Sequence, residues 1–417
     1  MSKIKSVTAR QIFDSRAIPT IEALVILEDG SSARSSVPTG EFHTAYEDVI
    51  LRDNDPKKYD GLGVMDAVKN VNDIIAPALL GKEAIHQTEV DKEMISLDGT
   101  PNKSKLGANA ILAVSQAVAK ASAKSSVLPL AFYLKQFVSQ SDKSKMPVPM
   151  FNLLEGGKHG GGSINFQEFL VIPASSKSFS DGLDIGLSVY HALENIIFER
   201  SQSALSAKEA GFSPDLSSNQ DGFGLLREAI ESSSYEFSLD LFMGLDACAG
   251  SFLTGKEYKL KDRADLYNQS ELVAFYKSLA SDFSLTYIED PFGQDDWDGW
   301  KKIHQELGDK VIISGDDLIS TNPYRLQLAL DNNVISGVVI KPSQIGTVTE
   351  AIAIAEIARF KNLKIIVSGR SGETGDNFIA DFAVGVGADY VKFGAPARER
   401  NIKYNRLLEI EEEMSKI

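Results

Sequence analysis

The stretch LTYIE, residues 285–289, is a short apolar run that ends at an acid, and it sets the pattern for the second half of the chain. VIISGD repeats the pattern and ends at Asp316, LFMGLD precedes it and ends at Asp246, and GVVIK follows it and ends at Lys341. The spacing between these ends holds one strand, one helix and their loops. The pattern therefore predicts parallel strands that alternate with helices.

Two more runs continue this pattern: KIIVSGR ends at Arg370 and DYVKFG carries Lys392. If parallel strands close into a barrel, the ends of all six strands lie on one face, where active sites of such barrels are built. We therefore expect an α/β barrel that gathers these acids and bases into a single site.

The three acids, Asp246, Glu289 and Asp316, are candidate ligands of one divalent cation. A single acid after a strand is commonly a helix N-cap or a solvated loop residue. Three acids at successive strand ends favour a shared ion, and magnesium prefers oxygen ligands while keeping positions for water and substrate.

The basic residues are candidates for contact with an anionic substrate. A lysine near a metal or another cation is pushed towards its neutral form, which a general base needs, so Lys341 and Lys392 are candidate bases. The alternative is two surface cations that balance the acids. Arg370 with Ser371 suits a phosphate, although the arginine could equally pair with a carboxylate.

Other candidates give weaker signals. GGKHGGG, residues 156–162, places His159 in a glycine-rich loop that can approach a ligand closely, but such turns are common. QEF contains Glu168, and KEAGFSP contains Glu209. The residues alone do not distinguish these two acids from the others.

Bulk composition excludes several classes of protein. The chain has 417 residues, so two domains are expected, and its charge of −15 with a pI near 4.9 argues against a nucleic-acid partner. The single cysteine, Cys248, allows no internal disulfide and is interpreted as a small buried hydrophobe. Neither a signal peptide nor a membrane span is evident, and the cytoplasm is the expected compartment.

The first third of the chain reads as strands followed by helices, which indicates an α+β cap domain. SVTARQIFDSR, PTIEALVILEDG and SSARSSVP predict an antiparallel opening, and alanine-rich helical segments follow. The polar, proline-terminated stretch SQSDKSKMPVP predicts a domain boundary, with a cap over residues 1–138 and a barrel over residues 139–417.

Long, ordered stretches resemble the enolase family over nearly the whole chain. They include DSRAIPT, SLDGTPNKSKLGANAILAVS, PVPMFNLLEGGKHGGG, YIEDPFGQDDW, SGDDLISTNP, VIKPSQIGT, SGRSGETGDNFIAD and YNRLLEIEEE. The resemblance implies the enolase type of fold, an eight-stranded α/β barrel with an N-terminal α+β cap.

The resemblance also implies roles for individual residues. By this resemblance, Asp246, Glu289 and Asp316 are the magnesium ligands, and Lys341 is the base. The acid that helps to expel the 3-hydroxyl is Glu209, with Glu168 as its partner. The groups implied to meet the substrate or to assist catalysis are Arg370, Ser371, Lys392, His159 and Gln167.

One departure from the family concerns a second magnesium. The family's first mobile loop reads S-G-A-S-T-G, whereas this chain has TGEFHT, residues 39–44. Phe42 replaces the serine that binds the second ion, and phenylalanine has no ligand atom. The substitutes available are Thr39, Glu41, Thr44 or a backbone carbonyl.

Two further departures lie near the implied acid. The family's D-E-G-G motif is KEAG here, with Lys208 before Glu209 and Ala210 after it. A cation beside Glu209 should favour its ionised form, which is a worse acid. The family's S-H-R-S stretch is SGRS, with Gly369 in place of histidine.

The resemblance implies a homo-oligomer, but the usual ion pair of the dimer is lost. Its positions are occupied by Glu22 and Glu409, which are two like charges. Dimerisation through that contact is therefore not expected.

The leading hypothesis is a hydro-lyase that carries out the magnesium-dependent, reversible dehydration of 2-phosphoglycerate to phosphoenolpyruvate, a glycolytic step. The altered loops leave two alternatives. One is a paralogue that uses the same lysine and magnesium on a different phospho- or phosphono-carboxylate. The other is a non-catalytic binding protein with the enolase fold, which an absence of magnesium binding would favour.

Overall fold

The computed structural model describes residues 2–41, 43–139, 145–200 and 207–416. Its first element is a three-stranded antiparallel sheet in the order β1 (Ile4–Phe13), β2 (Pro19–Leu27) and β3 (Ser32–Ser36). The turn between β2 and β3 contains Gly30, whose positive φ of 88° glycine accommodates readily. The predicted antiparallel opening is confirmed.

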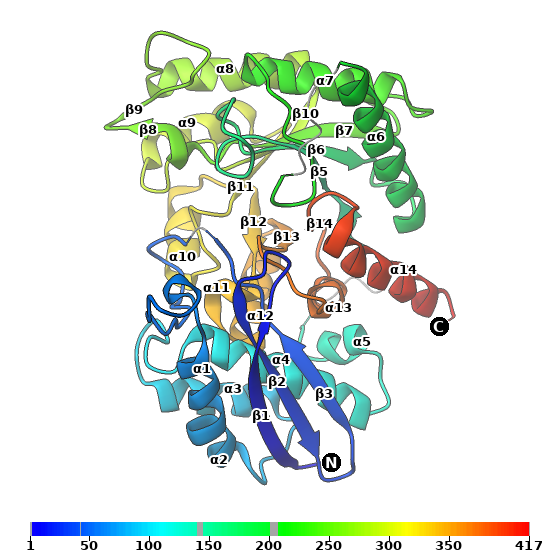
Figure 1. Cartoon of the computed structure of the whole chain (residues 1–417). Coiled ribbons are helices and arrows are strands. Elements are labelled where there is room, and N and C mark those ends of the chain that lie inside the picture. Colours follow the sequence, from blue (N-terminus) through cyan, green and yellow to red (C-terminus); the bar gives the residue numbers. More distant parts are fainter. Residues whose placement is uncertain (1, 42, 140–144, 201–206, 417) are drawn as a thin grey trace.

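Helices follow these strands and complete the cap, as predicted (Figure 1). Their bounds are α1 (Met65–Asn70), η2 (Val71–Ile75), α2 (Ala76–Leu79), α3 (Gln87–Asp98), α4 (Ala108–Ser125) and α5 (Leu130–Lys135). Alanine-rich α4 is almost entirely buried, because its small side chains let it pack against β2 and β3 on one side and against barrel helices α11 and α12 on another. This helix joins the cap to the barrel.

The second part is a closed α/β barrel with helices outside. Its sheet runs in the order β4-β14-β13-β12-β11-β10-β7-β6-β5, and only Met150 separates β4 from β5. The continuous segment β4–β5 pairs with β14 at its start and with β6 further along, so eight strands close the barrel. Their bounds are β4 (Val148–Pro149), β5 (Phe151–Glu155), β6 (Glu168–Pro173), β7 (Leu241–Asp246), β10 (Leu285–Glu289), β11 (Ile312–Gly315), β12 (Gly337–Ile340), β13 (Lys364–Ser368) and β14 (Tyr390–Lys392).

The expectation of a wholly parallel sheet was wrong at one place. Strand β6 runs antiparallel to both of its neighbours, β5 and β7. The reason is the connection between β5 and β6, residues 156–167, which contains no crossover helix and returns the chain beside β5. As a result Glu168 stands at the start of its strand, yet it pairs in register with Asp246 at the end of β7 and with Glu155 at the end of β5.

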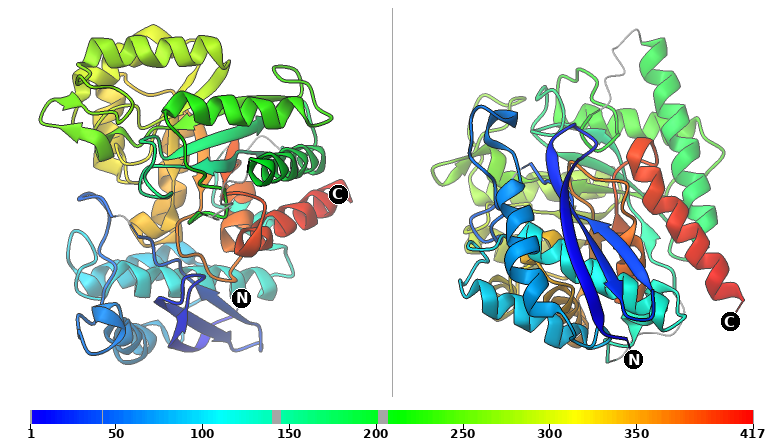
Figure 2. Two further views of the ribbon diagram at one scale, coloured as in Figure 1. Left: turned by 45° about the horizontal axis from the view of Figure 1, so that its top comes forward. Right: turned by 60° about the horizontal axis from the view of Figure 1, so that its bottom comes forward.

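Helices cover the outside of the barrel, and the cap lies at one side of it (Figure 2). The helices are α6 (Phe179–Glu199), α7 (Asn219–Glu231), α8 (Gln269–Asp282), α9 (Trp297–Leu307), α10 (Pro323–Asn332), α11 (Pro342–Ile345), α12 (Val348–Phe360), α13 (Phe378–Gly385) and α14 (Asn401–Ser415). C-terminal α14 lies against α6, where Glu411 accepts hydrogen bonds from the N–H groups of Phe179 and Ser180.

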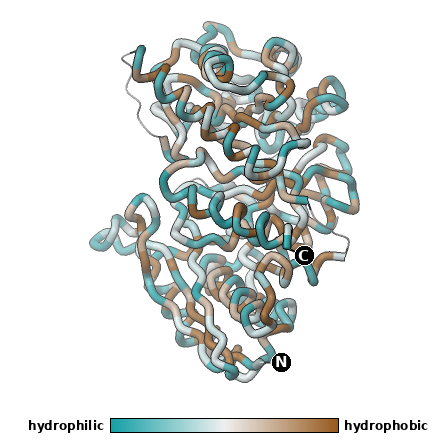
Figure 3. The backbone as a smooth tube through the Cα atoms, turned by 90° about the vertical axis from the view of Figure 1, so that its right-hand side faces the viewer, coloured by the Kyte–Doolittle hydropathy of each residue, from teal (hydrophilic) through white to brown (hydrophobic). Residues whose placement is uncertain are grey.

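The apolar residues form separate cores in the cap, inside the barrel, and between the barrel and its helices. Figure 3 shows hydrophobic segments throughout both parts of the chain. The inner core contains Leu170, Tyr287, Val339 and Ile366, whose side chains fill the barrel so that it is not a pore. Among the described helices, none has both the length and the apolar character needed to cross a membrane.

The predicted boundary between residues 138 and 139 borders residues 140–144, which lie outside the described part of the chain. It stays a prediction. The two like charges at Glu22 and Glu409 each have arginine partners within the chain. Glu22 lies 2.8 Å from Arg10 and 3.2 Å from Arg34, and Glu409 lies 2.9 Å from Arg406.

Candidate active site

Lys392 lies at the centre of the predicted site. It ends β14, and its ammonium donates to Glu168 at 2.9 Å, to Asp246 at 2.9 Å and to Glu289 at 2.8 Å. These side chains are all nearly inaccessible to solvent. One ammonium therefore faces three buried carboxylates, which together carry more negative charge than it can balance.

Lys341 pairs with Asp316 one position past the end of neighbouring strands β12 and β11. Burial lowers the pKa of Lys341, but the surrounding carboxylates, Asp316 first and then Glu289, together outweigh burial and the pKa is raised. The sequence predicted a lysine pushed towards its neutral form. In the chain without metal the direction is the opposite, because Asp316 directly contacts the ammonium.

The predicted metal ligands lie in two adjoining clusters of acids. Asp246 and Glu289 cluster with Asp290, and Asp316 clusters with Asp290 and Asp317; within each cluster the potential ligand atoms lie within 4.8 Å of one another. Burial raises the pKa of Asp246 to about 6 and also raises that of Glu289, and repulsion from the neighbouring carboxylates adds to this rise, while Lys392 opposes it. This crowded set of buried oxygen donors fits a hard divalent cation such as magnesium.

Asp290 orients one of these ligands. Its carboxylate accepts hydrogen bonds from the backbone N–H of Asp316 at 3.1 Å and of Asp317 at 2.7 Å. It therefore fixes the turn that follows β11. Asp246, Glu289 and Asp316, together with Glu168, are the acids whose carboxylates contact the two lysines.

Arg370, a predicted phosphate ligand, is buried and pairs with a cap residue. Its guanidinium lies 2.5 Å from the carboxylate of Glu47, which is also buried. Burial raises the pKa of Glu47, but Arg370 and His43 together outweigh burial and lower the pKa to about 2. Ser371 is adjacent, and its carbonyl accepts from the N–H of Gly40 at 3.1 Å.

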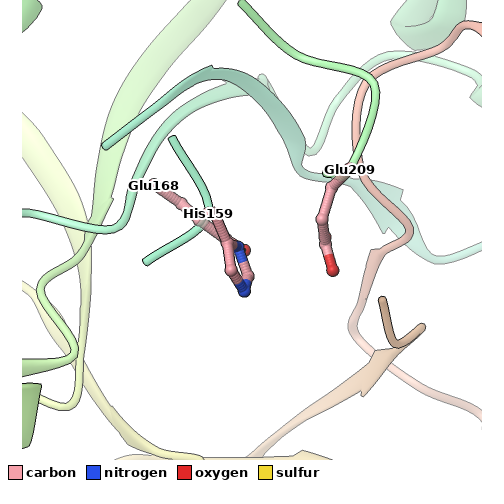
Figure 4. Close-up of side chains that lie close together, drawn as sticks. All are labelled: His159, Glu168 and Glu209. Atoms are coloured by element: carbon pink, nitrogen blue, oxygen red, sulfur yellow. The ribbon is translucent and has the colours of Figure 1, made fainter. Parts of the chain in front are cut away.

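The predicted acid residues form another part of the site. His159, Glu168 and Glu209 bring potential ligand atoms within 4.8 Å of one another, and Figure 4 shows Glu209 across an opening from the other two. The Nδ1 atom of His159 lies 3.2 Å from Glu168. Gln167 lies next in the chain and donates its N–H to the carbonyl of Asp246 at 3.0 Å. The structure thus brings these predicted residues together around one opening.

The altered loops contact each other. Lys208 lies 2.5 Å from Glu41, and Glu41 also lies 2.6 Å from Arg16. The sequence connected Lys208 only with its neighbour Glu209, whereas the structure gives its ammonium a carboxylate partner in the first loop. Phe42, on which the expectation about a second magnesium depended, lies outside the described residues.

The structure also shows the surroundings of the other two departures from the family motifs, at Ala210 and Gly369. Ala210 has a φ of 71°, a left-handed conformation that glycine adopts more easily, which explains why glycine suits this position in the family motif. At Gly369, an added Cβ would lie 3.3 Å from Arg400 and 3.2 Å from Glu373. Arg400 lies 3.7 Å from Glu209, so a buried guanidinium is near the position where the family has histidine.

These side chains surround a cavity of about 80 Å³. It adjoins a larger cleft of about 710 Å³, and Lys158, Cys248 and Asp317 line both. The site therefore has a route to the surface. The residues lining the cavity are Glu41, Glu47, Lys158, His159, Gln167, Glu168, Glu209, Asp246, Cys248, Asp316, Asp317, Lys341, Gln344, Ser368, Gly369, Arg370, Ser371 and Lys392.

Sequence reasoning did not assign Asp290, Asp317 and Glu47 to this site, and it considered Glu41 only as a substitute ligand for a second magnesium. Asp290 and Asp317 stand next to predicted ligands in EDPF and GDDL, so adjacency was an available signal. Glu41 and Glu47 are single acids in a cap segment, and no periodic pattern marks them. Their importance follows from contacts with residues far away in the sequence.

Comparison with known families supports the same assignment. Residues 4–134 match the family described as "Enolase, N-terminal domain", and residues 143–417 match "Enolase, C-terminal TIM barrel domain". The two matches cover almost the whole chain and confirm the resemblance found in the sequence. The chain belongs to the enolase family.

Proposed function

We propose that the chain catalyses the magnesium-dependent, reversible dehydration of 2-phosphoglycerate to phosphoenolpyruvate. The main support is the arrangement of base and acid around one cavity. Lys341 follows β12, whereas Glu209 lies in a loop that bridges to β5, three strands away around the barrel. A substrate between them would meet the base on one side and the acid on the other.

In this proposal the amine of Lys341 removes the proton from the α-carbon. Such a proton is weakly acidic next to a carboxylate, so the negative charge that develops must be neutralised. Lys392 supplies one positive charge at the centre of the site. Magnesium held by Asp246, Glu289 and Asp316 would supply further positive charge as a Lewis acid.

The remaining residues hold the substrate and assist loss of the hydroxyl. Arg370 and Ser371 bind the phosphate, with Arg370 leaving its pair with Glu47. Glu209 gives a proton to the departing 3-hydroxyl, which leaves as water, and His159 and Glu168 flank that position. Gln167 lines the cavity beside them and contributes a hydrogen-bonding side chain.

The test is to incubate the protein with 2-phosphoglycerate and magnesium at neutral pH and to follow the absorbance of the enol phosphate. Product should form with wild type and should fall at least about 100-fold in Lys341→Ala, the scale expected for loss of a general base. Absence of turnover in the folded, magnesium-saturated wild type would contradict the proposal.

A second candidate is the same proton abstraction on a bulkier phospho- or phosphono-carboxylate. Glu41 lines the cavity and contacts Lys208, and the cleft of about 710 Å³ adjoins it, so the surroundings of the reacting centre differ from those the family motif implies. Exchange of the α-proton of 2-phosphoglycerate without loss of water would favour this candidate.

A further inference from the structure

Glu155 is a buried acid at the end of β5 that the proposed reaction does not use. Its side chain has no measurable exposure to solvent, and its carboxylate lies 3.9 Å from Nδ1 of His159. The same carboxylate accepts hydrogen bonds from two backbone N–H groups of the loop that carries the proposed acid. These donors are Glu209, at 3.1 Å, and Gly211, at 2.9 Å.

The loop has the geometry of a backbone anion site. Ala210, between the two donors, has a φ of 71°. Successive residues that include a left-handed conformation curve the backbone so that neighbouring N–H groups point to one side, where they bind anions. The carboxylate fits closely, because a Cβ on Gly211 would lie 2.9 Å from Glu155 and 2.9 Å from the carbonyl of Asn152.

Other contacts fix the two flanks of this loop. The N–H of Phe212 donates to Leu153 at 2.9 Å, and the carbonyl of Glu209 accepts from Ala395 at 3.0 Å. The N–H groups on either side of Ala210 have the Glu155 carboxylate as their acceptor. Without that acceptor two buried donors would be left unpaired, which costs about 1–3 kcal/mol for each group.

We propose that Glu155 is a positioning residue for Glu209. Its carboxylate holds the backbone on both sides of Ala210, so that the Glu209 side chain reaches the cavity in a fixed direction. This inference rests on the proposed function, in which Glu209 gives its proton to the departing 3-hydroxyl. Glu155 itself does not touch the reacting atoms.

Either charge state of Glu155 can accept these hydrogen bonds. Burial raises the pKa of Glu155 to about 8, while His159 opposes that rise. A neutral carboxyl or an amide still offers one oxygen to the two N–H groups. The isosteric variant Glu155→Gln should therefore keep the loop in place, whereas Glu155→Ala should not.

The test compares two steps of the proposed reaction in the full chain with magnesium. In Glu155→Ala, loss of water from 2-phosphoglycerate should slow about 100-fold while exchange of the α-proton into deuterated solvent changes less than about threefold, as expected for misplacement of the acid alone. Glu155→Gln should restore water loss to within about threefold of wild type. Glu194→Ala, in an exposed position, is the control and should leave both rates unchanged.

A measurement that does not depend on activity separates this inference from the proposed function. Hydrogen exchange of the backbone, followed by mass spectrometry on peptides that cover residues 207–213, should be slow in wild type and in Glu155→Gln and at least about tenfold faster in Glu155→Ala, because the acceptor is lost. Equal slowing of water loss and α-proton exchange in Glu155→Ala would overturn the positioning role. Unchanged backbone amide exchange over residues 207–213 in that variant would also overturn it. Loss of α-proton exchange in wild type would instead contradict the proposed function.

Discussion

The carboxylate of Glu41 lies 2.5 Å from the ammonium of Lys208 and joins two loops whose residues are 167 positions apart. Both residues stand where the family motifs have others, S-G-A-S-T-G for the first loop and D-E-G-G for the second. The two changes therefore compensate each other in charge. Lys208 is held by the first loop and is directed towards Glu41.

The pairing predicts energetic coupling between the two loops. Glu41→Gln and Lys208→Gln should each lower the free energy of unfolding, and the double variant should lose less than their sum, with a coupling of about 0.5–1 kcal/mol for a partly exposed pair. Urea unfolding of the four proteins measures this coupling. The more exposed pair Lys277 and Glu306, 2.6 Å apart, serves as the control and should show a smaller coupling. Additive effects at Glu41 and Lys208 would show that the contact contributes nothing.

The excess of carboxylates around Lys392 predicts opposite effects on stability and on metal binding. Asp246→Asn keeps an acceptor for Lys392 and removes one of several repelling charges, so the metal-free protein should become more stable by about 1 kcal/mol. Calorimetry should show that magnesium binding is lost, because a ligand charge is gone. Asp184→Asn, at an exposed position on α6, should change neither quantity. Lower stability of metal-free Asp246→Asn would argue against crowding of charge.

The buried pair of Glu47 and Arg370 predicts a loss of stability in acid. The pKa of Glu47 is lowered to about 2, so its stabilising effect is complete above the unfolded pKa of 4.5 and disappears as the pH falls through about 2. Between pH 5 and pH 3 this residue should account for a loss of about 2 kcal/mol in the free energy of unfolding.

Unfolding of Glu47→Gln across the same pH range checks this expectation. Its stability should be lower than that of wild type at pH 5, because Arg370 loses its buried partner, and should fall less steeply towards pH 3. Parallel pH profiles for the two proteins would mean that the pair has no special effect on acid stability.

The left-handed conformation of Ala210 predicts that glycine is the better residue there. Ala210→Gly should raise the free energy of unfolding by up to about 1 kcal/mol, because it removes the steric cost of a Cβ at positive φ. Ala207→Gly, in the same loop but at negative φ, should lower it by about 0.5–1 kcal/mol. Thermal or urea unfolding measures both changes. A loss of stability in Ala210→Gly would show that the backbone of Ala210 is not strained.

Sequence periodicity was sufficient for much of the fold and for the ends of the parallel strands. Each apolar run had a strand's length, and parallel strands place their ends on one face, so Asp246, Glu289 and Lys341 could be predicted to meet. The direction of β6 could not be predicted, because the apolar run EFLVIP is equally compatible with a parallel and an antiparallel strand. The position of Glu168 opposite Asp246 therefore depended on the resemblance and not on periodicity.

The contacts between loops lay beyond what the sequence indicates. Glu47 and Arg370 are 323 positions apart, and although Arg370 ends one of the repeated apolar runs, no pattern marks Glu47 as its partner. The raised pKa of Lys341 likewise follows from direct contact with Asp316 in the folded chain. Local patterns predict elements. The partner of Arg370 is set by how the cap packs on the barrel, and the partner of Lys341 by the pairing of strands β11 and β12.

The proposed reaction depends above all on whether Lys341, acting with the three carboxylates, removes the α-proton. Nuclear magnetic resonance can follow the exchange of hydrogen at C2 of 2-phosphoglycerate for deuterium from the solvent. We predict exchange in wild type with magnesium, and none in magnesium-free protein or in folded Lys341→Ala. Equal exchange in wild type and in Lys341→Ala would show that Lys341 is not the base.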